Sequence, residues 1–361
     1  MSFVSIIMLA FSILGALDRI FGNRFGLGKE FERGFMLLGN MALAMIGMIV
    51  LSPLIATALE PAFEWVYAAL HIDPSIIPAS LFANDMGGTP LSQEVAQNEA
   101  VGMFNALVVS SMMGCTISFT LPYALGVVDK KNHKELFLGV LCGIVTIPVG
   151  CFVAGLMVKL PLLLLLVDLL PLILFAAIVA VGLIFAPNMT VRIFGVVGTI
   201  IKILITVGLV LGIVQFLTGK ELVKGLADIG EGADICFNAA IVLSGAFPLM
   251  YIVSKILSKP IVWFGKKLKI NENAAMGFVS TLVTNATTLE MTNRMDKKGV
   301  VLNSAFLVSS SFVFGSHLAF TMANGASYIP PMIVAKLTAG IAAFLLAIPI
   351  YHRVYEKKEA V

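Results

Sequence analysis

The chain has 361 residues, of which 59% are hydrophobic and only 12% are charged, and its mean hydropathy is +0.99. Soluble domains carry about 25% charged residues, so this composition excludes an ordinary soluble protein and predicts a polytopic membrane protein. The net charge of +3 is too small to indicate a nucleic-acid partner, and the sequence contains no P-loop, dinucleotide-binding, HExxH or GxSxG motif of an enzyme.

Long apolar runs predict membrane-spanning helices, each of which needs about 20 mostly apolar residues. The first run has no positive segment before it, and Arg19 and Arg24 follow it, so we expect an uncleaved helix with its N-terminus outside. In total we expect about nine spanning helices, over residues 3–20, 35–59, 101–128, 136–158, 160–186, 193–217, 235–257, 300–323 and 329–351.

Two further stretches, residues 75–93 and 274–293, are as long as a span but are interrupted by small and polar residues. If both crossed the membrane, the basic loops on either side of the second stretch would lie on opposite faces. If both enter and return, every strongly basic loop lies inside, as Lys and Arg prefer. We therefore predict two re-entrant hairpins, the first entering from outside and the second from inside, with the C-terminus in the cytoplasm.

The second half of the chain repeats the first at a constant offset without gaps. The aligned pairs include Leu81 with Leu282, Asn84 with Asn285, Ser110 with Ser311, Gly114 with Gly315, Thr120 with Thr321 and Pro148 with Pro349. We interpret this as a duplication with opposite orientation of the halves. The first repeat covers residues 1–159, a linking transmembrane helix covers 160–190, and the inverted second repeat covers 191–361. The predicted fold class is thus all-α, polytopic and built on an inverted repeat with two broken helical hairpins.

The first hairpin carries the polar string "ANDMGGTP" at its tip. Gly87 and Gly88 permit a tight turn, and Pro90 suits the first turn of a returning helix. A carboxylate at membrane depth costs about 2.5–3.5 kcal/mol on insertion scales. Asp85 is therefore a candidate counter-ion for a cationic solute, and the alternative is that Asn84 or Asp85 caps the returning helix.

The second hairpin carries "TNATTLEM" at its tip, with Ala286 at the position that aligns with Asp85. Its neutral donors and acceptors, which suit a hydroxyl group, are Asn285, Thr287 and Thr288. Glu290 is either a second acidic contact for a solute or the partner of Arg294 one turn away.

His317 is the histidine that falls inside a predicted span. A proton-relay or substrate-contact role and an interior hydrogen-bonding role are both open for it. For Asp168, in the linking helix, we expect a structural role. The four cysteines have no CxxC spacing and suit small core positions, and we expect no metal site and no cofactor.

Several segments, in the same order along nearly the whole chain, resemble the ethanolamine-utilisation permease family EutH. They include "FANDMGG", "SSMMG", "LGVLCGIVTIPVGC" and "NSAFLVSSSFVFGSHLAF". The resemblance implies a multi-pass carrier of the bacterial inner (cytoplasmic) membrane that imports ethanolamine for its catabolism. It extends to Met86 beside Asp85 and to Gly315 before His317, whereas Ser316 stands where we expect the family to have an acidic residue.

The function expected from residues and resemblance together is ethanolamine import by alternating access between the inverted halves. A carrier for another small amine or an amino acid, and a channel, are the alternatives; a membrane enzyme lacks a metal or nucleophile constellation. A homo-oligomer is left open. The expected substrate-binding residues are Asn84, Asp85, Gly87, Gly88, Asn285, Thr287, Thr288, Glu290 and His317.

Overall fold

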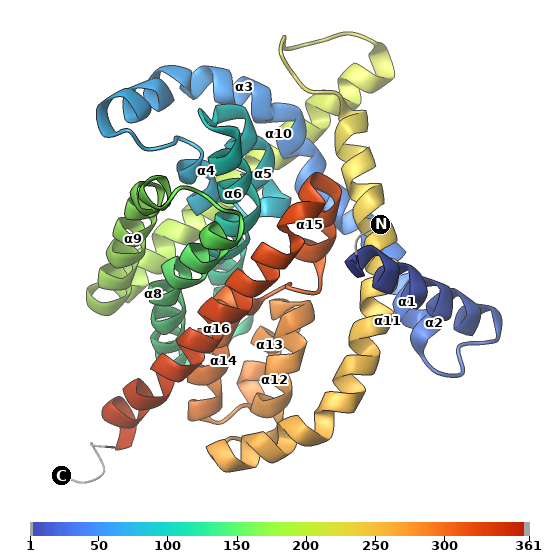
Figure 1. Cartoon of the computed structure of the whole chain (residues 1–361), viewed down its shortest axis with the longest axis vertical. Coiled ribbons are helices and arrows are strands. Elements are labelled where there is room, and N and C mark those ends of the chain that lie inside the picture. Colours follow the sequence, from blue (N-terminus) through green and yellow to red (C-terminus); the bar gives the residue numbers. More distant parts are fainter. Residues whose placement is uncertain (1–2, 357–361) are drawn as a thin grey trace.

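The computed structural model describes residues 3–356, and every regular element within that range is helical (Figure 1). Seven helices in this range are long and apolar enough to cross a membrane. The chain is therefore an all-helical, multi-pass membrane protein. Of the nine predicted spans, the first forms as α1 over the expected residues, Phe3–Ile20, but is not among these seven.

The first half of the chain, up to the turn near Lys159, is built from eight α-helices with shorter 3-10 and π-helical pieces between them. These are α1 Phe3–Ile20, α2 Leu27–Met36, α3 Leu38–Leu70, α4 Ile76–Leu81, η1 Asn84–Met86, α5 Gly88–Val95, α6 Glu99–Phe104, η2 Asn105–Gly114, η3 Thr116–Thr120, α7 Leu121–Val127, η4 Lys130–Asn132 and α8 His133–Met157. The π-helical pieces η2 and η3 join α6 to α7, so residues 99–127 form one long helical segment, as predicted for 101–128.

The second half begins with the linking helix. Its elements are α9 Leu162–Phe185, α10 Pro187–Thr218, α11 Ile229–Leu268, α12 Glu272–Val283, α13 Asn285–Met291, η5 Thr292–Arg294, α14 Lys297–Ser310, α15 Ser316–Gly325, η6 Ala326–Tyr328, α16 Ile329–Tyr351 and η7 His352–Glu356. The helices α8, α9, α10 and α16 lie close to the predicted spans, whereas α3 and α11 extend well beyond theirs.

One predicted helix is wrong: residues 300–323 form two helices, α14 and α15, with an unwound stretch between them. At this break Phe312 adopts a left-handed φ of 60°. Its N–H donates to the carbonyl of Thr281 at 3.2 Å, and the N–H of Phe314 donates to the carbonyl of Leu282 at 2.8 Å. Since non-helical backbone at membrane depth must find partners within the protein, these bonds to the end of α12 explain how the break is tolerated.

The helices α4 and α5 form the first hairpin, whose two ends lie together. The hydroxyl of Ser92, near the end of α5, donates to the carbonyl of Ser75, just before α4, at 3.1 Å. Oδ2 of Asp73 accepts the N–H groups of Gln97 and Asn98 at 3.1 and 2.9 Å. The chain thus enters and leaves this hairpin at one place.

The second hairpin, formed by α12 and α13, is joined in the same antiparallel way. The hydroxyl of Thr281 donates to Oγ1 of Thr288 at 3.0 Å, and that hydroxyl donates to the carbonyl of Gly277 at 3.1 Å. The N–H of Asn271, before α12, donates to Oδ1 of Asp296, after α13, at 2.8 Å.

The helices pack in two groups. In the first, which we call the core bundle, α8 packs against both α14 and α16, and the two hairpins and α6–α7 lie beside them. In the second, the frame, α11 packs against α1, α2 and α3, and α10 packs against α3. Figure 1 shows the golden α11 running along one side of the orange and red α12–α16, with the blue α1 and α2 outside it.

Candidate functional site

A central cavity of about 380 Å³ lies where the tips of the two hairpins meet the break between α14 and α15. Its wall also includes parts of α2, α3 and α11, so it lies between the core bundle and the frame. The polar or tip residues that line it include Ala83, Asp85, Thr284, Ala286, Ser316 and His317. Two of the predicted substrate-binding side chains, Asp85 and His317, are therefore brought together from segments more than 200 positions apart in the sequence.

Lining residues of the central cavity recur at one spacing in the sequence. Three pairs of them are separated by 201 positions, the offset between Asn84 and Asn285, and these are Ala83 with Thr284, Asp85 with Ala286, and Cys115 with Ser316. Equivalent positions of the two halves thus face the same space.

Asp85 is the one carboxylate among the described residues that line the central cavity. The side chain of Ser316 forms a hydrogen bond to it, and its Oδ1 lies 3.8 Å from Nε2 of His317. No side chain caps the start of α5, where Gly87 takes a left-handed φ of 104° and the N–H of Gly88 donates to the carbonyl of Ala83 at 2.8 Å. Asp85 therefore does not cap α5, which was the alternative interpretation, and its carboxyl group lines the cavity.

His317 connects Asp85 to a cation that the sequence reasoning missed. Nζ of Lys336, on α16, lies 3.1 Å from Nδ1 of His317 and donates to the carbonyl of Ser111 at 2.5 Å. The Lys336 side chain is completely buried. A single lysine in the apolar run of α16 is the signal that could have found it, because an ionisable group inside a membrane helix is costly.

The two predicted tip glycines shape the hairpin. A Cβ at Gly87 would lie 2.0 Å from Cγ of Met48 and would sit on left-handed backbone, and a Cβ at Gly88 would lie 2.4 Å from the carbonyl of Phe82. Both positions therefore need glycine, and neither residue lines the central cavity.

The remaining predicted residues are placed around the tips and not at the central cavity. Asn84 is completely buried and neither of its amide atoms has a hydrogen-bond partner among the described residues. Asn285 is also buried and donates from Nδ2 to Thr120 Oγ1 at 2.8 Å, while Thr288 lies inside the second hairpin. Glu290 accepts a 2.8 Å hydrogen bond from the hydroxyl of Tyr123 at an exposed position.

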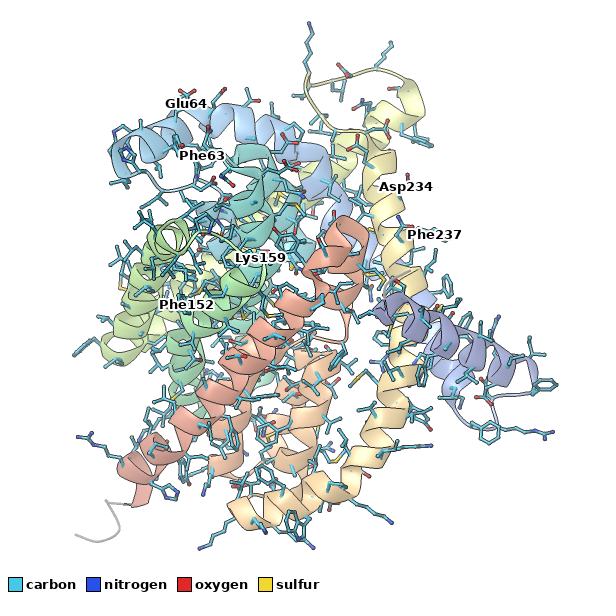
Figure 2. All side chains as sticks on the ribbon, in the orientation of Figure 1. Phe63, Glu64, Phe152, Lys159, Asp234 and Phe237 are labelled. Atoms are coloured by element: carbon cyan, nitrogen blue, oxygen red, sulfur yellow. The ribbon has the colours of Figure 1, made fainter. Side chains whose placement is uncertain are left out.

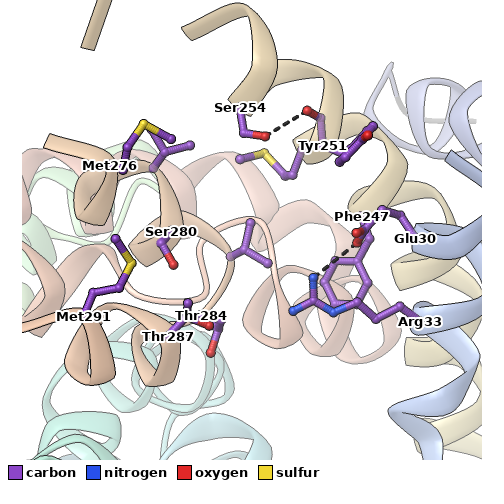
Figure 3. A pocket seen from close by; sticks show the side chains of 13 residues that line it. Glu30, Arg33, Phe247, Tyr251, Ser254, Met276, Ser280, Thr284, Thr287 and Met291 are labelled. Carbon is purple, nitrogen blue, oxygen red and sulfur yellow. Dashed lines mark hydrogen bonds and ion pairs between the residues drawn. The ribbon is translucent and has the colours of Figure 1, made fainter. Parts of the chain in front are cut away.

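A second cavity, of about 320 Å³ and here called the vestibule, adjoins the central one (Figure 3). Thr287 lines it, and four residues line both spaces: Arg33, Phe247, Val283 and Thr284. The Arg33 guanidinium lies 5.0 Å from the centre of the Phe247 ring and 3.2 Å from Oε2 of Glu30. Figure 3 shows this arginine reaching from α2 past the Phe247 ring, with Thr284 and Thr287 of the second hairpin on the other side of the vestibule.

A third cavity of about 360 Å³, here called the opposite pocket, lies against α5 and contains Glu94 and Glu231. Its lining pairs with that of the vestibule at the same 201-position offset. The pairs are Ile49 with Met250, Pro53 with Ser254, and Pro90 with Met291. The hairpin α4–α5 therefore borders the opposite pocket as α12–α13 borders the vestibule.

An all-helical membrane protein whose broken helices surround an internal cavity with a buried carboxylate is built like the secondary transporters. Sequence comparison makes this specific: residues 2–350 match the family described as ethanolamine utilisation protein, EutH, and the chain belongs to that family.

Its curated relatives cover nearly the whole chain. It is 44% identical over 354 residues to a probable ethanolamine permease EutH of Listeria monocytogenes, covering 98% of this chain and 95% of the relative. It is 38% identical to a protein of the same name from Escherichia coli, covering 94% and 93%. It is 35% identical to the uncharacterized protein YxeR of Bacillus subtilis, covering 94% and 92%. No solved structure matches the chain.

Proposed function

We propose that this protein is a permease that imports ethanolamine across the bacterial inner membrane for catabolism. The observation that carries the proposal is the single carboxylate, Asp85, in a central cavity formed by broken helices. The relatives named probable ethanolamine permease, which match over almost their full length, support the same substrate.

Ethanolamine at neutral pH is a small cation with an ammonium group at one end and a hydroxyl at the other. Asp85 supplies the charge-assisted acceptor that an ammonium needs. The aromatic rings of Phe119, Phe247 and Phe312 line the same cavity and add faces that attract a cation. The hydroxyl of Thr284 then replaces the predicted Thr287 and Thr288 as the partner of the substrate hydroxyl, because it lines the central cavity.

Alternating access follows from treating the two halves as an inverted repeat. The vestibule and the opposite pocket are lined at equivalent positions, and the central cavity contains both copies of three positions. Such pairing supports a pseudo-two-fold axis through the central cavity that relates the two halves. If the halves exchanged conformations, access to the central cavity would change from the vestibule to the opposite pocket. The vestibule shares residues with the central cavity and the opposite pocket does not, so we assign this conformation as open on the vestibule side.

We assign the vestibule side to the cytoplasm. The end of α16, which leads into the basic segment "HRVYEKKE", lies at the lower end in Figure 1. The acidic residues Glu64 and Asp234 both lie in the upper part of Figure 2, away from that basic end. This arrangement supports re-entrant hairpins that enter from opposite faces. Movement of the core bundle against the frame is the simplest way to exchange access, because the central cavity lies between them.

Labelled-ethanolamine counterflow in proteoliposomes tests the proposal. Proteoliposomes that are preloaded with unlabelled ethanolamine should take up the labelled substrate transiently, at a rate that saturates with concentration. Ethylamine, choline and glycine should compete to the extent that they share the ammonium and the hydroxyl group of ethanolamine. A carrier for another amine would give counterflow with that competitor and not with ethanolamine. Flux without saturation or counterflow would indicate a channel and overturn the carrier proposal.

A further inference from the structure

A site that only binds a cation does not need a buried lysine, yet Lys336 lies close to Asp85. It lies on the opposite side of His317 from Asp85, with 3.1 Å from Nζ to Nδ1 and 3.8 Å from Nε2 to Oδ1 of the carboxylate. A positive charge this near weakens the attraction of Asp85 for an ammonium substrate. Removing a lysine from water at membrane depth is itself costly, so the residue calls for a functional explanation.

The polarity of the hydrogen bonds defines how the three groups are arranged. A charged lysine has three donors and no acceptor, so Nδ1 of His317 accepts from Lys336. The neutral imidazole then carries its proton on Nε2, which points toward the carboxylate of Asp85. Lys336 is thus hydrogen-bonded to His317, and Nε2 of His317 faces the carboxylate of Asp85 on the wall of the central cavity at 3.8 Å, a gap that one small shift or a water can bridge.

The charges of this line balance when the site is empty. Lys336 carries one positive charge and Asp85 one negative charge, and the other titratable groups near Lys336 are His317 and the thiols of Cys115 and Cys151. Ethanolamine brings a second positive charge into the same low-dielectric space. Loss of one proton from Lys336 restores the balance, so substrate binding and protonation of Lys336 oppose each other.

We infer that Lys336 is the exchanging cation of the carrier: each ethanolamine that binds at Asp85 displaces one proton from Lys336, and transport is ammonium–proton exchange. This inference rests on the proposed ethanolamine function. The N–H bond that breaks is on Nζ; Nδ1 of His317 takes that proton, and Nε2 releases its own to water in the central cavity. When the substrate leaves on the other face, water returns a proton to Nε2, and Nδ1 passes one back to Nζ, which restores the original tautomer.

The exchange has a thermodynamic consequence. One ammonium in and one proton out has the same net result as movement of the neutral amine, so the membrane potential does not drive it. Uptake is then sustained by a reaction inside the cell that consumes the amine.

The test measures substrate binding and proton release together on purified protein in weakly buffered detergent solution, with ethanolamine as the ligand and a pH indicator as the second signal. In the native protein we expect about one proton released per ethanolamine bound, and an affinity that rises by about tenfold per pH unit while Lys336 is protonated. Lys336→Gln should bind ethanolamine with no proton release and no such pH dependence. The matched control is Lys202→Gln, because Lys202 is an exposed lysine on the membrane helix α10.

Transport measurements separate coupling from folding. Lys336→Gln should keep counterflow within about threefold of the native rate, because the loaded carrier crosses in both directions. Its net uptake should fall by about 100-fold, since the empty carrier would cross with Asp85 uncompensated. If the glutamine variant does not fold, Lys336→Arg keeps the volume and the charge and should bind ethanolamine more weakly, again without releasing a proton.

The outcomes distinguish the two proposals. Ethanolamine binding by native protein without proton release, or equal release by Lys336→Gln, overturns the exchange role of Lys336 and leaves the permease proposal intact. Absence of ethanolamine binding to folded native protein overturns the permease proposal, and the exchange proposal with it.

Discussion

Replacing Asp85 by asparagine should weaken ethanolamine binding without unfolding the protein. Asparagine keeps the size of the side chain and one acceptor oxygen, so the hydrogen bond from Ser316 can persist while the negative charge is lost. No second carboxylate lines the central cavity within the described part of the chain, so nothing else there can balance the ammonium.

The magnitude follows from the kind of interaction that is lost. A hydrogen bond to a charged group contributes about 1.5–3 kcal/mol, compared with about 1 kcal/mol for a neutral one. Loss of the ammonium–carboxylate contact therefore predicts binding that is about 10- to 140-fold weaker. Because the substitution also leaves Lys336 without its nearby counter-charge, thermal unfolding in detergent is measured first, and binding is compared only at temperatures where both proteins are folded.

Counterflow of labelled ethanolamine at a series of concentrations measures the effect as a rise in KM. The matched control is Glu290→Gln, which also removes a predicted acidic contact but lies at an exposed position bonded to Tyr123. Its KM should stay within twofold of the native value. A folded Asp85→Asn protein with native KM would refute the assignment of the ammonium to this carboxylate, and a large effect of Glu290→Gln would move it to the second hairpin.

Three other predictions concern the hairpins. Gly114→Ala places a Cβ 1.9 Å from the carbonyl of Phe82, at the end of α4, and should lower the free energy of unfolding by about 1–3 kcal/mol or more. The control Gly126→Ala, whose Cβ would have nothing within 4 Å, should change it by no more than about 0.5 kcal/mol in the same thermal-unfolding assay. Equal effects of the two variants would show that the π-helical segment does not pack as described. Asp73→Asn weakens the hydrogen bonds that join the two ends of the first hairpin and should lower the free energy of unfolding by about 1.5–3 kcal/mol. The control Glu64→Gln, at an exposed position, should leave the thermal unfolding temperature unchanged. An unchanged stability of Asp73→Asn would mean that these ends are held by packing alone. Cysteines placed at the exposed positions Asn98 and Asn273 should react with a membrane-impermeant reagent from outside and from inside, respectively, and reaction of both from one side would exclude inverted hairpins.

The polar tip of the first hairpin could be predicted from the sequence because its signals are local. An Asp and two glycines between apolar runs predict a turn, and Gly87 does take the left-handed conformation that only glycine adopts easily. Asp85 and His317 could each be picked out as candidate contacts because ionisable groups at membrane depth are costly, but the sequence does not show that both line one cavity.

The break between α14 and α15 could not be predicted, because its cause is tertiary. The stretch "SFVFG" is apolar and has no proline, so it is typical of a continuous helix. It unwinds where the N–H groups of Phe312 and Phe314 find the carbonyls at the end of α12, which is distant in sequence. Local patterns carry no information about such a partner.

The second hairpin shows a different limit. The sequence places three threonines close together at its tip, but it does not give the rotation of α13, and each residue turns the helix by about 100°. As a result Thr284, just before α13, lines both the central cavity and the vestibule, Thr287 lines the vestibule alone, and Thr288 bonds within the hairpin. Only the packing of α13 against α12 and α7 decides between them.

The equivalent positions of the two halves share geometry but not chemistry. Asp85 corresponds to Ala286, and Lys336 corresponds to Glu135, which is buried near the start of α8 and bonds to Tyr355 instead of facing the central cavity. A second carboxylate at position 286 would demand a second cation in the same cavity, whereas ethanolamine carries one. If the halves are an inverted repeat as proposed, the two hairpins would provide the two entrances, while the charges proposed to select the substrate occur once, at the cavity between them.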